Sequence, residues 1–379
     1  MLKLNKVSLE GYKSIKHCRD LKLENLNVLI GANGSGKSNF LSFFKLLQRE
    51  MIGAIQEFIG RSGGRDYLLH FGAKVTPKIT AELEMMIESR PFSYRMTLTE
   101  AKPDTLIFTE ESVQDFKPGV DVDPDRHISL IPGLPFYLGA GHKESALLLP
   151  ERARNPIAQF FKNTLSHFRF YQFDDTSDQS HMRSRSDLNG PSYLYEDGGN
   201  IAAFLFLLRE KQPECYQRVV ETVHLVFPFF KDFVLDPDKG GGNYVMLRWR
   251  ATGSAEYEFG PHQISDGTLR FIALATLLLQ PHDWLPPLIA IDEPELGLHP
   301  YAIKILASLL QDAANFTQII VATQSAALVD LMEPDDVIVA DMVDGATQFE
   351  RLSREKLKEW LEEYTLSQLW DMNFVGGRP

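Results

Sequence analysis

Residues 31–38, which read GANGSGKS, could hold the phosphates of a nucleotide. The spacing is that of a P-loop: a glycine, four residues, then Gly36, Lys37 and Ser38. In such a loop the backbone N–H groups and a helix N-terminus hold the phosphates, the lysine reaches the β and γ oxygens, and the hydroxyl ligates Mg²⁺. An apolar run at 26–30 precedes the loop and a helical pattern at 39–50 follows it, as this mechanism requires. The sequence therefore predicts ATP and Mg²⁺ as cofactors, with these nucleotide ligands: Gly31, Asn33, Gly34, Ser35, Gly36, Lys37, Ser38 and Asn39.

A second apolar run ends in two adjacent acids, Asp292 and Glu293, within the segment LIAIDEPELGLHP at 288–300. A strand that ends in this way delivers both carboxylates to the sheet edge where the nucleotide should lie. Asp292 is then placed to hold Mg²⁺, directly or through water, and Glu293 to accept a proton from the attacking water. The alternative is a helix N-terminus whose dipole favours two acids. The presence of a P-loop favours the first interpretation.

The segment QISDGTLRF at 263–271 offers a second place for an anion. Ser265, Asp266 and Gly267 stand at the start of an apolar helical pattern, where a hydroxyl and free backbone N–H groups are available. Taken alone, the segment indicates only a well-capped helix. Together with the P-loop and the paired acids, it makes Ser265 and Gly267 candidate nucleotide ligands.

This set of motifs resembles the ABC ATPase superfamily, and within it the RecF, SMC and OLD-type ATPases. The resemblance lies in the opening GYKSI at 11–15, in GANGSGKSN, SDGTLRF and DEPELGLHP, and in the closing GGRP. Apart from GGRP, the matching segments fall in residues 1–48 and 262–345. The resemblance implies that residues 264–268 replace the LSGGQ signature and bind the γ-phosphate held by the P-loop of a second copy. ATP would then be sandwiched in a homodimer.

The same resemblance implies roles for further positions. Gln172 matches the Q-loop glutamine that meets Mg²⁺ and the attacking water. Gln324, in VATQS, stands where most ABC proteins have a switch histidine, and His299 stands where many have a D-loop aspartate. Glutamine can donate a hydrogen bond but cannot become charged, so slow hydrolysis is one consequence. The expected catalytic residues are Lys37, Glu293 and Gln324, and the expected metal ligands are Ser38, Asp292 and Gln172.

To position these motifs, the chain needs a sheet covered by helices, and its patterns predict an α/β fold of this kind. Strands are indicated over 4–30, and antiparallel strands at 79–87, 93–99 and 106–109. In the last third, strands and helices alternate at 244–248, 265–279, 288–291, 300–313 and 318–323. We therefore expect an ABC-type ATPase head with a mixed or parallel sheet, an antiparallel β portion and an inserted helical subdomain.

We expect four parts along the chain: core at 1–110, a largely helical insertion at 111–240, core again at 241–352 and a helical tail at 353–379. Helical spacing at 151–168 and 200–227 indicates the insertion. Asp344 and Gly345 predict a two-residue hairpin between runs at 337–342 and 347–352. Ser353 is expected to cap an amphipathic helix, the Pro- and Asp-rich stretch 117–135 to be a surface excursion, and 376–379 to fray.

The composition limits the classes of protein that fit. A net charge of −12 argues against a general nucleic-acid coat, although a local basic strip lies between Lys3 and Lys22. Two cysteines, Cys18 and Cys215, are too few for a disulfide framework, which favours a reducing, cytoplasmic setting. The longest apolar stretch is less than half a membrane span, and no secretory signal opens the chain. We expect no association with a membrane.

From the resemblance, the leading hypothesis is an ATP-gated dimer in DNA maintenance or in defence against phage and mobile elements. OLD-type proteins carry a TOPRIM nuclease after the ATPase, whereas about 35 residues follow Gly345 here. An effector such as a nuclease is therefore expected on a separate chain, and DNA is a possible partner. Two alternatives stay open: a scaffold or switch that hardly hydrolyses ATP, and, less favoured, the nucleotide-binding subunit of a transporter.

Overall fold

The structure is a computed structural model that describes residues 2–87, 90–115, 134–150, 155–190, 193–237, 242–253 and 257–378. Its strands are β1 Leu2–Tyr12, β2 Ile15–Lys22, β3 Leu26–Ile30, β4 Lys78–Ile87, β5 Arg90–Ala101, β6 Thr105–Asp115, β7 Phe136–Gly139, β8 Arg169–Tyr171, β9 Ser186–Asp187, β10 Phe230–Val234, β11 Tyr244–Val245, β12 Arg248–Ala251, β13 Glu258–Phe259, β14 Leu288–Asp292, β15 Gln318–Ala322, β16 Val337–Val343 and β17 Ala346–Arg351. Its α-helices are α1 Lys37–Met51, α2 Ile55–Arg61, α3 Arg65–Leu68, α4 Pro156–Ser166, α5 Ile201–Lys211, α6 Pro213–Val226, α7 Asp266–Leu278, α8 Pro300–Ala313, α9 Ala326–Val329, α10 Arg354–Leu357 and α11 Leu366–Asp371.

A six-stranded sheet in the order β17-β16-β3-β15-β14-β8 lies at the centre of the molecule. Strands β16, β3, β15, β14 and β8 run parallel, and β17 returns antiparallel to β16. The sheet is apolar on both faces, as expected for a parallel sheet between helical layers. The carboxyl ends of β3, β15 and β14 therefore meet at one edge, and the predicted motifs follow them there.

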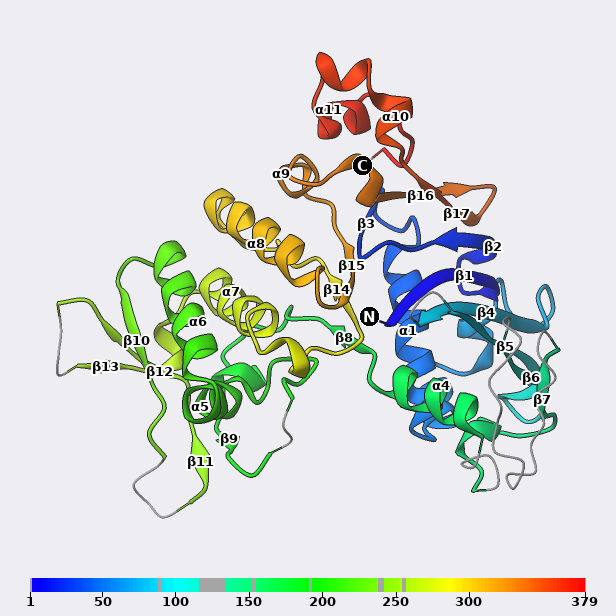
Figure 1. Cartoon of the computed structure of the whole chain (residues 1–379), viewed down its shortest axis with the longest axis horizontal. Coiled ribbons are helices and arrows are strands. Elements are labelled where there is room, and N and C mark those ends of the chain that lie inside the picture. Colours follow the sequence, from blue (N-terminus) through cyan, green and yellow to red (C-terminus); the bar gives the residue numbers. More distant parts are fainter. Residues whose placement is uncertain are drawn as a thin grey trace.

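Successive residues of the central strands enter two different cores. Val28 and Ile30 of β3 pack with helices α5, α6, α7 and α8, whereas Leu29 packs with α1 and α4. Figure 1 shows these two groups of helices on opposite sides of β14 and β15. The P-loop helix α1 and the helix α7 after the signature-like segment thus cover opposite faces of one sheet.

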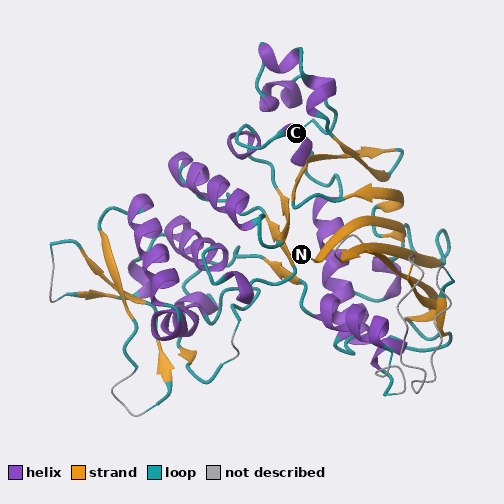
Figure 2. Cartoon of the chain, viewed as in Figure 1, coloured by secondary structure: helices purple, strands orange, loops and turns teal. Residues whose placement is uncertain are grey.

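An antiparallel sheet in the order β2-β1-β4-β5-β6-β7 completes the core that contains α1. Its strands lie beyond α1 in Figures 1 and 2, so α1 is enclosed between two sheets. Phe40, Phe43 and Phe44 of α1 are fully buried, and the ring of Phe43 meets Tyr12 of β1 edge-on at 5.8 Å between centroids. This packing fixes the helix whose N-terminus carries the P-loop.

The structure confirms the predicted α/β fold class. The three predicted antiparallel strands are β4, β5 and β6, and the alternation of the last third is present with boundaries within about two residues. The strand expected at 244–248 is instead two short strands, β11 and β12, which belong to different small sheets. Most of the expected excursion at 117–135 lies outside the described residues.

The expected division at residues 110, 240 and 352 stays a prediction. Strand β8, within 111–240, forms an edge of the central sheet, and α4 packs against α1. Of the helices in the described ranges, none combines the length and the apolar character needed to cross a membrane.

Two expectations for the tail are wrong. Ser353 makes no side-chain capping bond, and α10 spans only Arg354–Leu357. Residues 376–378 do not fray, because Gly377 is buried and its carbonyl oxygen accepts a 2.6 Å hydrogen bond from the indole nitrogen of Trp370. The apolar Trp370 is itself fully buried, and this tertiary anchor overrides the local tendency of a Gly-Gly pair to be disordered.

Candidate nucleotide-binding site

The P-loop joins β3 to α1 in a backbone conformation that requires glycine. Gly31, Gly34 and Gly36 have φ values of 151°, 76° and 102°, in the region that L-residues rarely adopt. A side chain at Gly31 would meet the carbonyl oxygen of Ala340, and one at Gly36 would meet the hydroxyl of Thr347. The loop is therefore held against the β16–β17 hairpin, and Thr347 adds a 2.8 Å hydrogen bond to the Ser35 carbonyl.

Lys37 lies in the hollow of this loop and is only 5% exposed. Its Nζ donates to the carbonyl oxygens of Gly31 at 2.6 Å and Ala32 at 2.9 Å. Burial lowers the pKa of Lys37, and the negative charges of Glu293 and Asp292 oppose that shift. The predicted P-loop lysine and the two predicted acids are thus brought into one electrostatic neighbourhood.

Asp292, the last residue of β14, faces the first turn of α1. Its carboxylate is hydrogen-bonded to the Ser38 side chain, and burial raises its pKa. The Oδ1 atom of Asp292 is buried with no hydrogen-bond partner. The described residues contain no cluster of three or more His, Cys, Asp or Glu that could hold a metal by itself. One carboxylate and one hydroxyl fit Mg²⁺, which typically takes few protein ligands and completes its shell with phosphate and water oxygens.

Glu293 begins the loop after β14 and is held in an unusual conformation, with φ of 45°. Its backbone N–H donates to the Ala322 carbonyl at 2.8 Å, so the loop stays attached to the end of β15. The Nε2 atom of Gln324 donates to Oε1 of Glu293 at 2.6 Å. The structure therefore brings together the residues predicted as general base and as switch.

Gln172 follows β8, the edge strand beside β14. Its amide nitrogen lies 3.2 Å from Oδ2 of Asp174, and the side chain is exposed. Gln172, Asp292 and Glu293 line one pocket. The fold is therefore compatible with the position next to the acids that the family resemblance implies for Gln172. The side chain of Gln172 is hydrogen-bonded to Asp174.

Ser265 and Gly267 lie at the start of α7. The Ser265 hydroxyl caps the helix, accepting from the Thr268 backbone N–H at 3.2 Å, and is exposed. A side chain at Gly267 would meet the carbonyl oxygen of Gly297, in the loop after Glu293. Figure 1 shows α7 and α1 on opposite sides of β14, so the helices that follow the signature segment and the P-loop cover opposite faces of the sheet.

His299 ends the loop after Glu293 and caps α8. Its Nδ1 accepts from the Tyr301 backbone N–H at 3.2 Å, and the residue is exposed. His299, which stands where the family resemblance suggests an aspartate, thus has a local role as the cap of α8.

Two arginines that the sequence analysis did not single out hold these loops together. Arg270 of α7 donates to the carbonyl oxygens of Phe173 at 2.7 Å, Asp174 at 3.1 Å and Leu296. It therefore links the segments after Gln172 and after Glu293 to the signature helix. Burial lowers the pKa of Arg270, as expected for a desolvated guanidinium.

The second of these, Arg183, is 5% exposed and binds the start of the signature segment. It donates to the Ile264 carbonyl at 3.1 Å and to the Asp266 carboxylate at 2.8 Å. Arg270 stands in the SDGTLRF segment that carries the family resemblance, whereas the sequence marks Arg183 only as part of a basic patch with Arg185.

Glu295 is a third acid that the sequence analysis left without a role. Its Oε1 accepts from the Thr323 hydroxyl at 2.5 Å and from the Gln324 backbone N–H at 3.2 Å. Burial raises its pKa, and the second oxygen, Oε2, has no partner. Glu295 thus fixes the backbone that presents Gln324 to Glu293.

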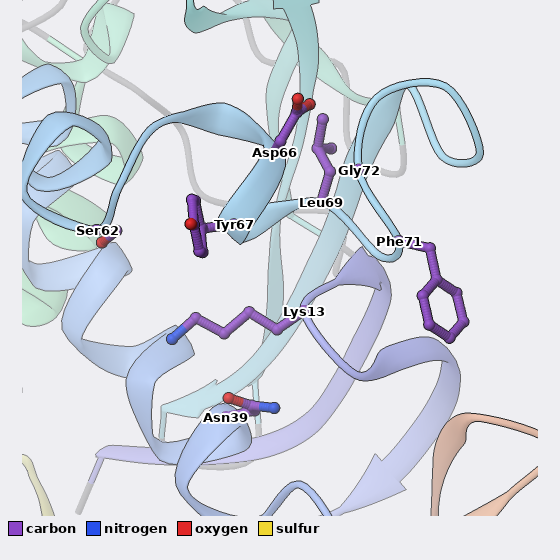
Figure 3. Close-up of a pocket in the computed structure, with 8 residues that line it drawn as sticks. All are labelled: Lys13, Asn39, Ser62, Asp66, Tyr67, Leu69, Phe71 and Gly72. Atoms are coloured by element: carbon purple, nitrogen blue, oxygen red, sulfur yellow. The ribbon is translucent and has the colours of Figure 1, made fainter.

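A second pocket opens beside the first turn of α1 (Figure 3). Lys13 and Asn39 form one wall, and Tyr67 of α3 stands opposite. Nζ of Lys13 donates to Ser42 at 2.9 Å, and burial lowers the pKa of this lysine. Asn39 donates to Ser14 at 2.7 Å. The pocket thus combines a cation, an amide and an aromatic ring that is 71% exposed.

Comparison with known protein families gives two matches. Residues 2–181 match the family described as "AAA ATPase domain", and residues 254–330 match the one described as "AAA domain, putative AbiEii toxin, Type IV TA system". The first covers the P-loop and Gln172, and the second covers the signature segment, the paired acids and Gln324. A search of curated protein sequences found no match.

Solved SMC heads share the fold over nearly the whole chain. An SMC head bound to the C-winged helix domain of ScpA is 15% identical, with a TM-score of 0.58 over 94% of this chain and 99% of that one. The SMC head domain from Pyrococcus furiosus has an extended coiled coil and is bound to the C-terminal domain of ScpA. It is 14% identical, with a TM-score of 0.57 over 96% of this chain and 99% of that one. The SMC head domain from Thermotoga maritima is 14% identical, with a TM-score of 0.50 over 93% of this chain and 99% of that one. Two parts of the chain thus match AAA ATPase domain families, and the chain has the fold of SMC heads.

Proposed function

We propose that the chain binds ATP with Mg²⁺ and hydrolyses it in a dimer that sandwiches the nucleotide. The observation that supports this most directly is the convergence of Lys37, Asp292, Glu293 and Gln324 at one edge of the central sheet. A P-loop lysine, a carboxylate bonded to the P-loop serine and a second carboxylate held by an amide form a phosphoryl-transfer site.

The residues would divide the work as follows. Lys37 would give up its hydrogen bonds to two carbonyl oxygens and bind the β and γ oxygens of ATP instead. Ser38, Asp292 and Gln172 would hold the cation. Bound Mg²⁺ supplies charge neutralisation of the phosphates. Glu293 accepts the proton of the attacking water, and the Gln324 amide keeps the carboxylate oriented for it. Because Gln324 cannot carry a charge, we expect slow turnover.

The pocket of Figure 3 would take the base and ribose. It lies at Asn39, directly after the serine that ligates the cation, where a nucleotide leaving the P-loop must pass. Tyr67 can stack on a base, and Lys13 can donate to the α-phosphate or the ribose.

The dimer is supported by the place of the signature segment. Ser265 is exposed at the N-terminus of α7, and α7 and the P-loop helix α1 belong to different cores on opposite faces of the central sheet. A hydroxyl and free N–H groups at a helix N-terminus suit a γ-phosphate brought by a second copy. The ATP site would thus be complete only between two chains.

For the biological role we propose ATP-gated work in DNA maintenance or in defence against phage and mobile elements, with a separate effector such as a nuclease. The solved SMC heads bind ScpA as a separate chain, which favours control through a partner. Cys18 and Cys215 are both free, in keeping with a cytoplasmic setting. The alternative, an ATP-dependent scaffold with little hydrolysis, is favoured by Gln324 at the switch position.

Two substitutions test the site. Lys37→Ala should abolish ATP binding measured by calorimetry, whereas Lys304→Ala on α8, far from the loop, should leave it unchanged. The Glu293→Gln variant should still bind ATP, but its turnover should be lower by about 100-fold or more. Glutamine removes the general base and keeps a side chain of nearly the same size. Unchanged ATP binding by Lys37→Ala would refute the nucleotide site.

The role in DNA is tested separately, by the ATPase rate and by binding to duplex DNA at two salt concentrations. Stimulation, with binding that weakens as salt rises, is expected for phosphate contacts. If neither occurs, the scaffold or a protein effector alone is favoured.

A further inference from the structure

A third pocket opens between the second half of α1 and two segments of the chain, 166–174 and 193–197. Its volume is about 560 Å³, in the range of sites for small ligands. Lys45 and Arg49 of α1 line it, eight and twelve residues after Lys37 and thus about 12 and 18 Å further along the helix. A ligand in this pocket would leave the P-loop free.

Two cations of the pocket share one loosely held carboxylate. Nζ of Lys45 and Nη2 of Arg49 lie 4.0 and 3.8 Å from the same atom, Oε2 of Glu196. Within the described part of the chain, the Glu196 carboxylate accepts no hydrogen bond, and all three side chains are 25% to 35% exposed. The two cations therefore face a position for an anionic oxygen that a phosphate group can take over from Glu196.

Aromatic rings form another part of the wall. The guanidinium of Arg169 lies 4.7 Å from the ring centroid of Tyr193, and the ring of Tyr195 meets that of Tyr193 edge-on at 5.9 Å between centroids. Nζ of Lys45 lies 5.3 Å from the ring centroid of Phe170. Tyr193 is 40% exposed, so part of its surface is open to a ligand. Aromatic rings next to cations are the combination that binds a base together with its phosphate.

The other two carboxylates of the pocket have partners of their own. Oδ2 of Asp197 lies 2.7 Å from Nδ1 of His181. Oδ1 of Asp174 accepts from the Asp175 backbone N–H at 2.9 Å, and Oδ2 accepts from the Gln172 amide at 3.2 Å. Glu196 is therefore the carboxylate that would compete with a phosphate for the two cations of α1.

We propose that this pocket binds a nucleotide unit, with the base stacked on Tyr193 and the phosphate between Lys45 and Arg49 in place of Glu196. A free nucleoside monophosphate and a single strand of nucleic acid both offer this chemistry. The pocket also adjoins the proposed ATP site, because the Gln172 backbone N–H donates to the Glu196 carbonyl oxygen at 3.0 Å. A ligand that displaces the Glu196 side chain would thus act next to a proposed metal ligand.

The test uses the full chain carrying Lys37→Ala, so that the P-loop does not contribute to binding. Fluorescence anisotropy would measure binding of a labelled oligothymidylate, and calorimetry would measure binding of thymidine monophosphate. Tighter binding of the oligonucleotide would identify a single strand as the ligand, whereas equal binding would identify the free nucleotide. Because neither assay contains ATP, their failure would overturn this site and leave the proposed ATP site untouched.

Tyr193→Ala should weaken binding of the probes about tenfold, and Tyr193→Phe, which keeps a ring, should stay within about twofold. Glu196→Gln should strengthen binding about threefold, because it removes the competing anion, and a misfolded variant would not show such a gain. Tyr257→Ala, at a tyrosine that is 55% exposed beside β13, is the matched control and should bind like its parent. Absence of binding by both probes, or an unchanged affinity in either Tyr193→Ala or Glu196→Gln, would overturn the assignment.

Discussion

Gln324 and Glu293 are 31 positions apart in the chain and share a 2.6 Å hydrogen bond. In the proposed mechanism this bond would let a residue that cannot ionise serve at the switch position, because the amide would orient the base. Glu295 accepts a hydrogen bond from the Gln324 backbone N–H and so holds this backbone in place. At the scale of single residues, we therefore expect turnover to depend on the pair formed by the Gln324 amide and the Glu293 carboxylate.

We expect Gln324→Ala to lower the turnover number about tenfold to a hundredfold, because it removes one hydrogen bond to a charged group. The KM for ATP should stay within about twofold, since Lys37 and Ser38 are untouched. Gln311→Ala, an exposed glutamine of α8, is the matched control. Steady-state ATPase assays over a range of ATP concentrations measure both values. A variant that turns over like the wild type would show that Gln324 does not orient the base.

The residues that sequence alone could predict are those with a motif around them. The P-loop, Asp292 and Glu293 belong to short segments whose spacing carries the mechanism. Arg270 and Gly377 act through carbonyl oxygens and close packing with partners 26 to 97 positions away, or more than 300 in the case of Gly31. No local pattern encodes such partners, so the sequence alone does not predict these contacts.

At the scale of secondary-structure elements, helix α7 is connected to two loops of the site through Arg270. Its three hydrogen bonds join the segment after β8, the loop after β14 and the signature helix. A shift of α7 when a γ-phosphate binds Ser265 would therefore reach both Gln172 and Glu293.

Arg270→Ala should lower the free energy of unfolding by about 3 kcal/mol, because buried carbonyl oxygens lose a charged donor. Arg270→Lys keeps the charge but lacks the geometry for three carbonyl groups, so it should recover only part of this loss. Urea unfolding measures the effect. Arg61→Ala, whose side chain is 81% exposed, should change stability by less than about 0.5 kcal/mol. Equal stability of Arg270→Ala and Arg61→Ala would contradict the connector role.

The P-loop helix α1 is tied to the antiparallel sheet by two fully buried carboxyl groups. The Tyr94 hydroxyl lies between Glu50 and Glu111, 2.8 Å from the latter, and Ala146 N–H also donates to Glu111 at 2.8 Å. Tyr94 has one hydrogen to donate, so one carboxyl must supply its own. Burial, and next the charge of Glu111, raise the pKa of Glu50 well above its ordinary value, and burial also raises the pKa of Glu111. We therefore expect Glu50 to be the protonated partner.

A carboxyl whose pKa is higher in the folded than in the unfolded state stabilises the fold below its ordinary pKa, and this stabilisation is lost as pH rises toward the folded value. The wild type should therefore lose stability as pH rises above the ordinary pKa of a glutamate toward the raised pKa of Glu50. Glu50→Gln, which mimics the neutral acid, should flatten that dependence in urea unfolding. Glu57→Gln, exposed on α2, should leave it unchanged. Parallel curves for Glu50→Gln and wild type would refute a protonated Glu50.

Helices and strands with strong periodicity, such as α8 and β4, were predictable because each buries one regular face. The tail was not. Ser353 begins only four helical residues, and the last turn of the chain is ordered by Trp370 and Gly377 instead of by a cap. Tertiary packing decided these elements, against the local signals.

The whole molecule carries the two helices proposed to bind phosphate on opposite faces of one sheet. In one chain α1 faces one core and α7 the other, and in the proposed dimer the P-loop and the signature segment of one chain would serve different sites. A homodimer with twofold symmetry would make two equal sites from four half-sites. The net charge of −12 disfavours the close approach of two copies. In the proposed dimer this repulsion would have to be offset by contacts of the bound nucleotide with Lys37, Ser265 and Gly267.

Mixing two inactive variants tests this central claim most directly. Lys37→Ala lacks the P-loop function, and Ser265→Arg blocks the signature, so each should be inactive alone. In an equal mixture half of the dimers pair the two variants, and one of the two sites in each such dimer is intact, so ATPase activity should return to about a quarter of the wild-type value. A mixture that stays as inactive as its components would contradict an ATP site built from two chains.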